Sequence, residues 1–238
     1  MKIRYKAFWI TALLILVSVT IYAFSILTNV MGVYRKYLQF ADGGKQYIPF
    51  IYRISQDTPE EYAAGINAGA AVWTNVETAY WVFEEGERTS ETRNKRDQTN
   101  LIFFDVDNSS GSFEEGTSTI AFSMTWSNIS AQEGFHATES DMVWNARDYP
   151  PSADPNYCPP DQFDLQSIIA HELGHHLGLG HTGSHGSPPG IGELVPEATM
   201  YGYGYYGDTT KRSLHLQDIA GVSEIYPTWQ LSGTVSDS

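Results

Sequence analysis

The sequence predicts an α+β fold, in which one domain of strands and helices follows an apolar N-terminal segment. Five short runs rich in β-branched and aromatic residues predict strands. Two longer segments repeat apolar residues at helical spacing. The first 34 residues have the character of an export or membrane segment and are set apart from the domain. A chain of 238 residues has room for one ordinary domain with these additions.

Composition excludes several classes of protein. Hydrophobic residues make up 42% of the chain and charged residues 18%, which is typical of a folded domain and excludes wholesale disorder. The net charge of −14 is unfavourable for binding nucleic acid phosphates, so no nucleic acid partner is expected. Cys158 is the only cysteine, which excludes an intramolecular disulfide and a cysteine-rich zinc finger.

The apolar segment over residues 7–34 contains no charged residue. As a helix rising about 1.5 Å per residue it would reach roughly 42 Å, longer than a bilayer core of about 30 Å. One interpretation is therefore an uncleaved signal anchor, a single transmembrane helix. The other is a cleaved signal peptide, because basic residues precede the segment and Ala23-Phe24-Ser25 offers a peptidase site. Both place residues 35–238 outside the cytoplasm, on the extracellular face of a membrane or secreted.

The chain is divided into four parts on this basis. Residues 1–34 are the signal anchor or signal peptide, and residues 35–46 are a polar, glycine-containing linker. Residues 47–228 are predicted to form the domain, and residues 229–238 a C-terminal tail.

The first strand of the domain is predicted from the alternation of Ile48, Phe50, Tyr52 and Ile54, which is the period of a strand with one buried face. A helix over residues 59–75 follows. Thr58-Pro59-Glu60-Glu61 predicts its start, with Thr58 as N-cap, proline at the first helical position and a capping-box glutamate.

Four more strands are predicted before residue 148, over residues 80–83, 101–106, 119–126 and 141–144. Residues 148–163 are rich in Pro, Asp and Asn and predict an irregular loop. Asp164 is then expected to cap a second helix that starts at Leu165.

The second helix contains the pattern H-E-x-x-H-x-x-G-x-x-H over residues 171–181. His171 and His175 are four residues apart, so their imidazoles point to one side of a helix and can share a metal ion, with Glu172 beside them. Gly178 permits the positive φ at which the chain turns, so that His181 can return as a third ligand. Three neutral imidazoles leave the fourth position of a tetrahedral zinc ion to water. The pattern therefore predicts one catalytic zinc.

The remaining histidines are not at ligand spacing. His136, His185 and His215 are interpreted as residues that bind no metal. His176 lies inside the pattern but faces away from its neighbours' shared side, so we expect a solvent or packing residue.

The histidine pattern resembles that of the metzincin metalloendopeptidases, and within them the matrixin (matrix metalloproteinase-like) branch. The resemblance spans roughly residues 47–226, and residues 198–201 (Ala-Thr-Met-Tyr) look like the Met-turn that follows the motif. It implies a metzincin-like catalytic domain, with a twisted five-stranded mixed sheet, two long helices and a C-terminal helix over residues 214–226. It also implies that Met200 forms a hydrophobic base beneath the zinc.

The resemblance further implies that residues 119–126 are an antiparallel edge strand that pairs with substrate. The residues assigned to substrate binding on this basis are Thr119, Ile120, Ala121, Phe122 and Ser123.

Three features depart from the family pattern or extend it. A prodomain with a zinc-blocking cysteine is missing, because Cys158 follows the core strands, so latency by a cysteine switch is not expected. Histidines for a second, structural zinc are absent around residues 121–123, so one zinc is expected. Residues 105–109 (Asp-Val-Asp-Asn-Ser) could surround calcium but lack the EF-hand glycine and glutamate, and a solvated turn is the favoured interpretation.

These features predict a zinc-dependent endopeptidase that hydrolyses proteins or peptides outside the cytoplasm. The zinc would polarise the scissile carbonyl and lower the pKa of bound water towards about 7. Glu172 would take the proton of that water and deliver it to the departing amine. The alternative is a noncatalytic metal-binding or adhesion module at the membrane surface, against which the intact Glu172 argues. Protein or peptide substrates are the expected partners, with the membrane if the N-terminal helix is retained; no oligomeric state is predicted.

Overall fold

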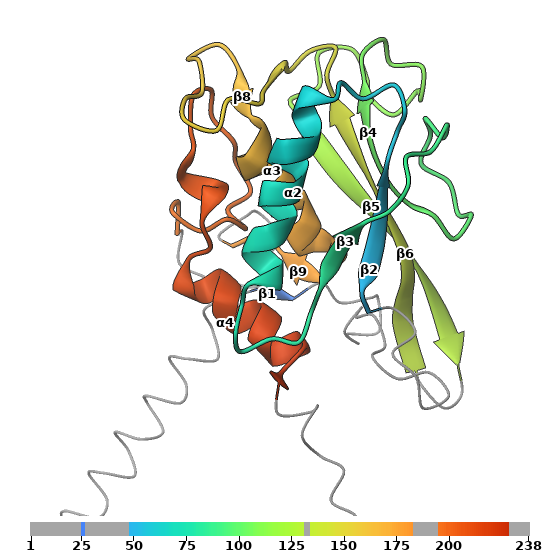
Figure 1. The fold of residues 1–238 in the computed structure, drawn as a ribbon, viewed down its shortest axis with the longest axis vertical. Coiled ribbons are helices and arrows are strands. Elements are labelled where there is room, and N and C mark those ends of the chain that lie inside the picture. Colours follow the sequence, from blue (N-terminus) through green and yellow to red (C-terminus); the bar gives the residue numbers. More distant parts are fainter. Residues whose placement is uncertain (1–24, 27–47, 131–133, 183–194, 229–238) are drawn as a thin grey trace, which may run out of the picture.

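The computed structural model describes residues 25–26, 48–130, 134–182 and 195–228 (Figure 1). Its centre is a five-stranded sheet with the order β3-β2-β4-β6-β5. The strands are β2 (Phe50–Ile54), β3 (Phe83–Glu85), β4 (Asn100–Asp105), β5 (Ala121–Ser130) and β6 (Gly134–Asn145). β5 is antiparallel to β6, and the other neighbours are parallel. The predicted five-stranded mixed sheet is therefore confirmed.

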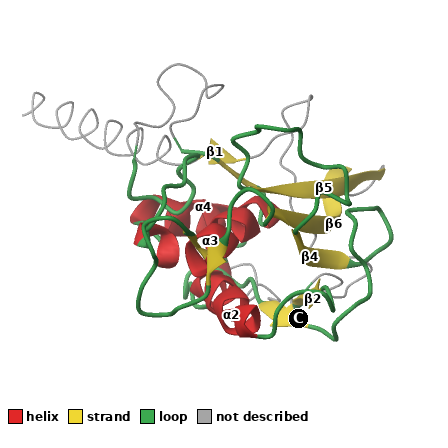
Figure 2. Ribbon diagram, turned by 90° about the horizontal axis from the view of Figure 1, so that it is seen from above, coloured by secondary structure: helices red, strands yellow, loops and turns green. Residues whose placement is uncertain are grey.

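Three helices cover one face of this sheet (Figure 2). They are α2 (Glu61–Thr74), α3 (Leu165–His176) and α4 (Leu216–Ile225). The buried residues of α2, which include Ile66, Ala70 and Trp73, recur at helical spacing and face the core. The indole Nε1 of Trp73 donates a hydrogen bond of 2.8 Å to the carbonyl oxygen of Ala170, so α2 holds α3 in place.

Short elements complete the described part of the chain. β1 (Ser25–Ile26) pairs with β9 (Leu179–Gly180), and β7 (Pro151–Ser152) pairs with β8 (Phe163–Asp164). A 3₁₀ turn, η1 (Thr210–Arg212), precedes α4.

The predicted bounds of the strand over residues 80–83 are wrong, because β3 begins only at Phe83. Tyr80 and Trp81 are buried, but they pack against Tyr226 at the end of α4 instead of pairing in the sheet. The Tyr80 amide donates to the Tyr226 carbonyl at 2.9 Å, and the rings of Trp81 and Tyr226 lie 4.5 Å apart. The aromatic run over residues 80–83 therefore predicted burial correctly, but its first residues are not a strand.

The predicted start of the first long helix is wrong by two residues. The N-cap position is Glu60, and Thr58 does not cap the helix. The Thr58 amide donates to the Ser55 carbonyl at 3.1 Å, and the Thr58 carbonyl accepts from Arg88 at 2.7 Å. These contacts fix Thr58 in a turn before the helix, which a local capping pattern cannot reveal.

The predicted N-terminal helix is not shown. Most of residues 7–34 lie outside the described part of the chain, and the two described residues, Ser25 and Ile26, form strand β1. Among the described residues, none of the helices has the length and apolar character needed to cross a bilayer.

Candidate active site

The helix α3 lies in the interior, and ten of its twelve residues are buried. Asp164 occupies the N-cap position with extended backbone, as predicted, but its carboxylate does not bond to the first turn. Both Asp164 oxygens instead accept hydrogen bonds from Arg212 Nε, at 2.7 and 2.8 Å. This ion pair ties the start of α3 to the last residue of η1.

The three predicted metal ligands meet at the end of this helix. The Nε2 atom of His181 lies 3.0 Å from the Nε2 atom of His171 and 3.0 Å from that of His175. All three ligand atoms lie within 4.8 Å of one another. His171 and His175 therefore point to one side of α3, as their spacing predicted.

The return of His181 depends on the turn at Gly178. This residue has a φ of +94°, in the left-handed region that favours glycine. Its amide donates to the His175 carbonyl at 3.0 Å, so the helix closes there and the chain leaves it through β9. The predicted role of Gly178 is confirmed.

Backbone carbonyls orient two of the imidazoles. Nδ1 of His171 lies 2.6 Å from the Thr199 carbonyl oxygen, and Nδ1 of His175 lies 2.7 Å from that of Leu179. A carbonyl can only accept, so both Nδ1 atoms carry the proton and both Nε2 atoms present lone pairs to the centre. Burial lowers the pKa of His171 well below its usual range and that of His175 to about 3, which keeps the rings neutral.

Three imidazoles whose Nε2 atoms converge form a donor set that fits zinc. Within the described residues no second group of three such side chains brings its ligand atoms this close. The cluster therefore supports the catalytic zinc that the sequence predicted.

The predicted Met-turn packs against α3 at Gly174, between the two ligands that the helix carries. Met200 is buried, and a Cβ atom added to Gly174 would lie only 2.2 Å from its Sδ atom. The close approach of helix and Met-turn thus requires a glycine at position 174. Met200 packs on the turn of α3 that carries the ligands, and its role as a hydrophobic base beneath the zinc stays a prediction.

Two charged residues that sequence reasoning missed hold the Met-turn. The Asp218 carboxylate, in the first turn of α4, accepts hydrogen bonds from the amides of Thr199 and Met200 at 2.8 and 3.1 Å. Lys211 is buried, and its Nζ donates to the carbonyls of Thr199, at 3.1 Å, and Tyr201. Burial lowers the pKa of Lys211 to about 8. Asp218 could have been found as a capping residue, whereas no sequence signal distinguished Lys211.

Glu172 lies beside the ligands with only 4% of its surface exposed. Burial raises the pKa of its carboxyl group to about 7, and a hydrogen bond from Ser123 acts in the opposite direction. The Ser123 hydroxyl lies 2.9 Å from Oε2 and 3.0 Å from the carbonyl oxygen of the same glutamate. The sequence placed Ser123 among the substrate-binding residues and gave no sign of this contact.

A cleft of about 800 Å³ opens over the three histidines and Glu172. One wall is β5, the strand at the edge of the sheet, together with the residues before it. Residues 201–204 and Lys211 also line the cleft. The predicted substrate-binding residues, Thr119, Ile120, Ala121, Phe122 and Ser123, all line the cleft.

His176, His215 and Cys158 lie elsewhere in the described part of the chain. His176 is buried against Phe50, with ring centroids 5.7 Å apart, so its interpretation as a packing residue is confirmed. His215 caps α4, while His185 lies outside the described residues. Cys158 is buried near the carbonyl of Gln162, and burial raises the pKa of its thiol.

The acidic loop after β4 is closed by its own hydrogen bonds. The Asp105 carboxylate accepts from the amides of Ser109 and Ser110, at 3.0 and 3.3 Å. Asn108, at a φ of +59°, bonds to both backbone groups of Phe113. These contacts are those of the turn that the sequence favoured.

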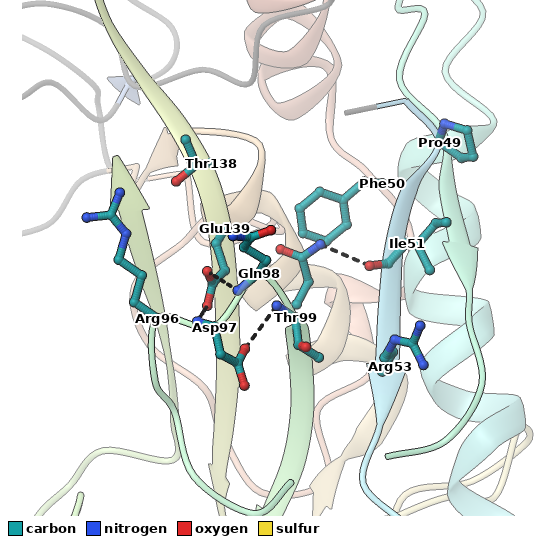
Figure 3. Close-up of a pocket in the computed structure, with 11 residues that line it drawn as sticks. Pro49, Phe50, Ile51, Arg53, Arg96, Asp97, Gln98, Thr99, Thr138 and Glu139 are labelled. Carbon is teal, nitrogen blue, oxygen red and sulfur yellow. Dashed lines mark hydrogen bonds between the residues drawn. The ribbon is translucent and has the colours of Figure 1, made fainter. Parts of the chain in front are cut away.

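A second hollow, of about 720 Å³, lies where β4 begins between β2 and β6 (Figure 3). The Asn100 side chain bridges the gap by donating to the Ile51 carbonyl and accepting from the Ser140 amide, each at 2.9 Å. The Glu139 carboxylate accepts from the amides of Asp97 and Gln98. The Asn100 amide group and the Glu139 carboxylate are thus bound to backbone, and none of the three clustered histidines lines this hollow.

Comparison with known proteins agrees with this site. The model of the Matrixin family matches residues 50–227. Among solved structures, the chain is similar to high choriolytic enzyme 1, a hatching enzyme zinc-protease from the medaka fish Oryzias latipes. The identity is 11% and the TM-score 0.40, over 84% of this chain and 98% of that one. That similarity is too low to transfer the role of any residue.

Proposed function

The chain belongs to the matrixin family and is a zinc metalloendopeptidase, and we propose that it cleaves proteins outside the cytoplasm with Glu172 as its proton carrier. The observation that supports this most directly is the convergence of three imidazoles beside a buried glutamate at the floor of one cleft. A purely structural metal site has no use for a carboxylate placed there.

His171, His175 and His181 would hold the zinc ion through their Nε2 atoms. When bound, such an ion supplies Lewis acidity, which polarises a carbonyl group and lowers the pKa of water. The Thr199 and Leu179 carbonyls keep the proton of two imidazoles on Nδ1, so these rings stay oriented as ligands.

Glu172 handles the proton in this scheme. Its carboxylate accepts a proton from the water that attacks the scissile carbonyl carbon. The same group then delivers the proton to the amine nitrogen as the carbon–nitrogen bond breaks, so that it ends the cycle ionised.

The substrate is proposed to bind as an extended chain along β5. This strand pairs with β6 on one side, and its other side faces the cleft. Main-chain hydrogen bonds along an edge strand supply affinity, and they bring the scissile peptide bond over the centre.

A proline scan over residues 120–125 tests this binding mode. Proline removes an amide donor, so at positions that face the substrate it should slow cleavage of a long peptide about tenfold or more. Zinc content and thermal unfolding are measured in parallel to select the folded variants. If every folded, zinc-loaded variant cleaves at the parent rate, substrate does not bind along β5.

The location and the activity can be tested together. The uncharged run of residues 7–34 supports export of the domain. Intact cells that express the full chain should therefore degrade casein added to the medium. A zinc chelator should stop this degradation, and added zinc should restore it. Degradation that occurs only after lysis would contradict the location, and zinc binding without any degradation would favour the noncatalytic adhesion module.

A further inference from the structure

Ser123 makes a contact to Glu172 that substrate binding does not explain. It belongs to β5, and its hydroxyl reaches across to α3, 49 residues further along the chain. The oxygen lies 2.9 Å from Oε2 of Glu172, which is the distance of a well-formed hydrogen bond. The hydroxyl has one proton, and a carboxylate oxygen is a stronger acceptor than the neutral carbonyl 3.0 Å away. With Glu172 ionised, Ser123 therefore donates to Oε2.

This contact matters because a glutamate does not fix its own carboxylate. The last torsion of a glutamate side chain is broad and roughly two-fold, so the plane of the carboxylate is set by its surroundings. Glu172 is buried, and in such an environment a hydrogen bond to a charged group is stronger than in water. With Oε2 held by Ser123, the second oxygen, Oε1, is left for the proton of the attacking water.

We propose that Ser123 is a positioning residue of the reaction, which orients the Glu172 carboxylate through the hydrogen bond to Oε2. The inference rests on the proposed role of Glu172 and replaces the assignment of the Ser123 side chain to substrate binding. Ser123 acts through Glu172, so its effect belongs to the chemical step, whereas a substrate contact would act mainly on binding.

The first test is the Ser123→Ala variant of the full chain, measured with a fluorogenic peptide. We expect kcat to fall roughly tenfold to a hundredfold, as when a hydrogen bond to a charged group is lost, with KM changed less than about twofold. Ser123→Thr retains a hydroxyl on a strand and should recover most of kcat. Ser123→Cys keeps a similar side-chain volume but offers only a weak donor, so it should also lose activity. This variant tests the proposal if Ser123→Ala folds poorly.

A matched control removes a hydroxyl from the neighbouring strand. Thr138 of β6 lines the second hollow, away from the cleft, and its hydroxyl reaches only the Trp126 carbonyl at 3.4 Å. Thr138→Val preserves the side-chain volume and should cleave at the parent rate. Zinc content and thermal unfolding are compared across all variants, and a positioning role requires them to stay near the parent values.

The decisive measurement repeats Ser123→Ala in a Glu172→Ala background. A residue that acts through Glu172 should cause no further loss there. An equal fold-loss in both backgrounds would overturn the inference, as would an unchanged kcat or a raised KM with unchanged kcat. If the parent is active and any of these three results is found, the inference about Ser123 is wrong and the proposed function still stands. A parent without chelator-sensitive cleavage contradicts the proposed function and the inference together.

Discussion

Replacing Glu172 with alanine is expected to reduce proteolysis to a small residual rate while the chain keeps its zinc. The three Nε2 atoms meet without help from the glutamate, because carbonyl oxygens and the turn at Gly178 orient the histidines. Removing the group that carries the proton should lower kcat by about 100-fold to 10,000-fold. Peptide cleavage and zinc content, determined on the same preparation, check this outcome.

The control for this variant is Glu84→Ala. Glu84 is an exposed glutamate on β3, which forms the opposite edge of the sheet from β5, the strand that lines the cleft. The Glu84→Ala variant should cleave the peptide and bind zinc as the parent does. Normal turnover by a zinc-loaded Glu172→Ala protein would remove Glu172 from the mechanism, whereas loss of zinc from this variant would give the carboxylate a role in assembling the centre.

The parts of the site that the sequence predicted are those set by spacing within one short segment. A helical spacing of four fixes the common direction of His171 and His175, and a glycine at position 178 fixes where the chain turns. Both depend on local backbone geometry, so the sequence suffices. The strand alternation in residues 48–54 succeeded for the same reason, because β2 buries Phe50, Tyr52 and Ile54 on one face.

The parts that could not be predicted depend on contacts between distant segments. Ser123 and Glu172 are 49 residues apart, and Lys211 reaches the Met-turn carbonyls from a segment with no regular pattern. The extension of β5 and β6 into a long hairpin also escaped prediction. The register of the pair shifts between Trp126 and Ser127, and such an irregularity is set by the pairing of the two strands and not by the pattern within either one.

Replacing His181 with alanine is expected to remove the zinc itself, and proteolysis with it. His181 is the ligand that both other imidazoles approach, each with an Nε2–Nε2 distance of 3.0 Å. Without it the centre has two nitrogen donors, which is an incomplete set for a catalytic zinc site. Metal analysis should find well below one zinc per chain, in contrast with the Glu172→Ala protein.

Thermal unfolding gives a second measure of the same loss. An ion that binds only the folded chain raises its stability according to its concentration and affinity, so zinc should raise the unfolding temperature of the parent and not that of His181→Ala. His215→Asn is the matched control, because His215 caps α4 and asparagine is a favoured N-cap residue. That variant should keep its zinc and its response to zinc. One tightly held zinc per chain in His181→Ala would show that His181 is not a ligand, because the centre would then be complete without the imidazole that returns after Gly178.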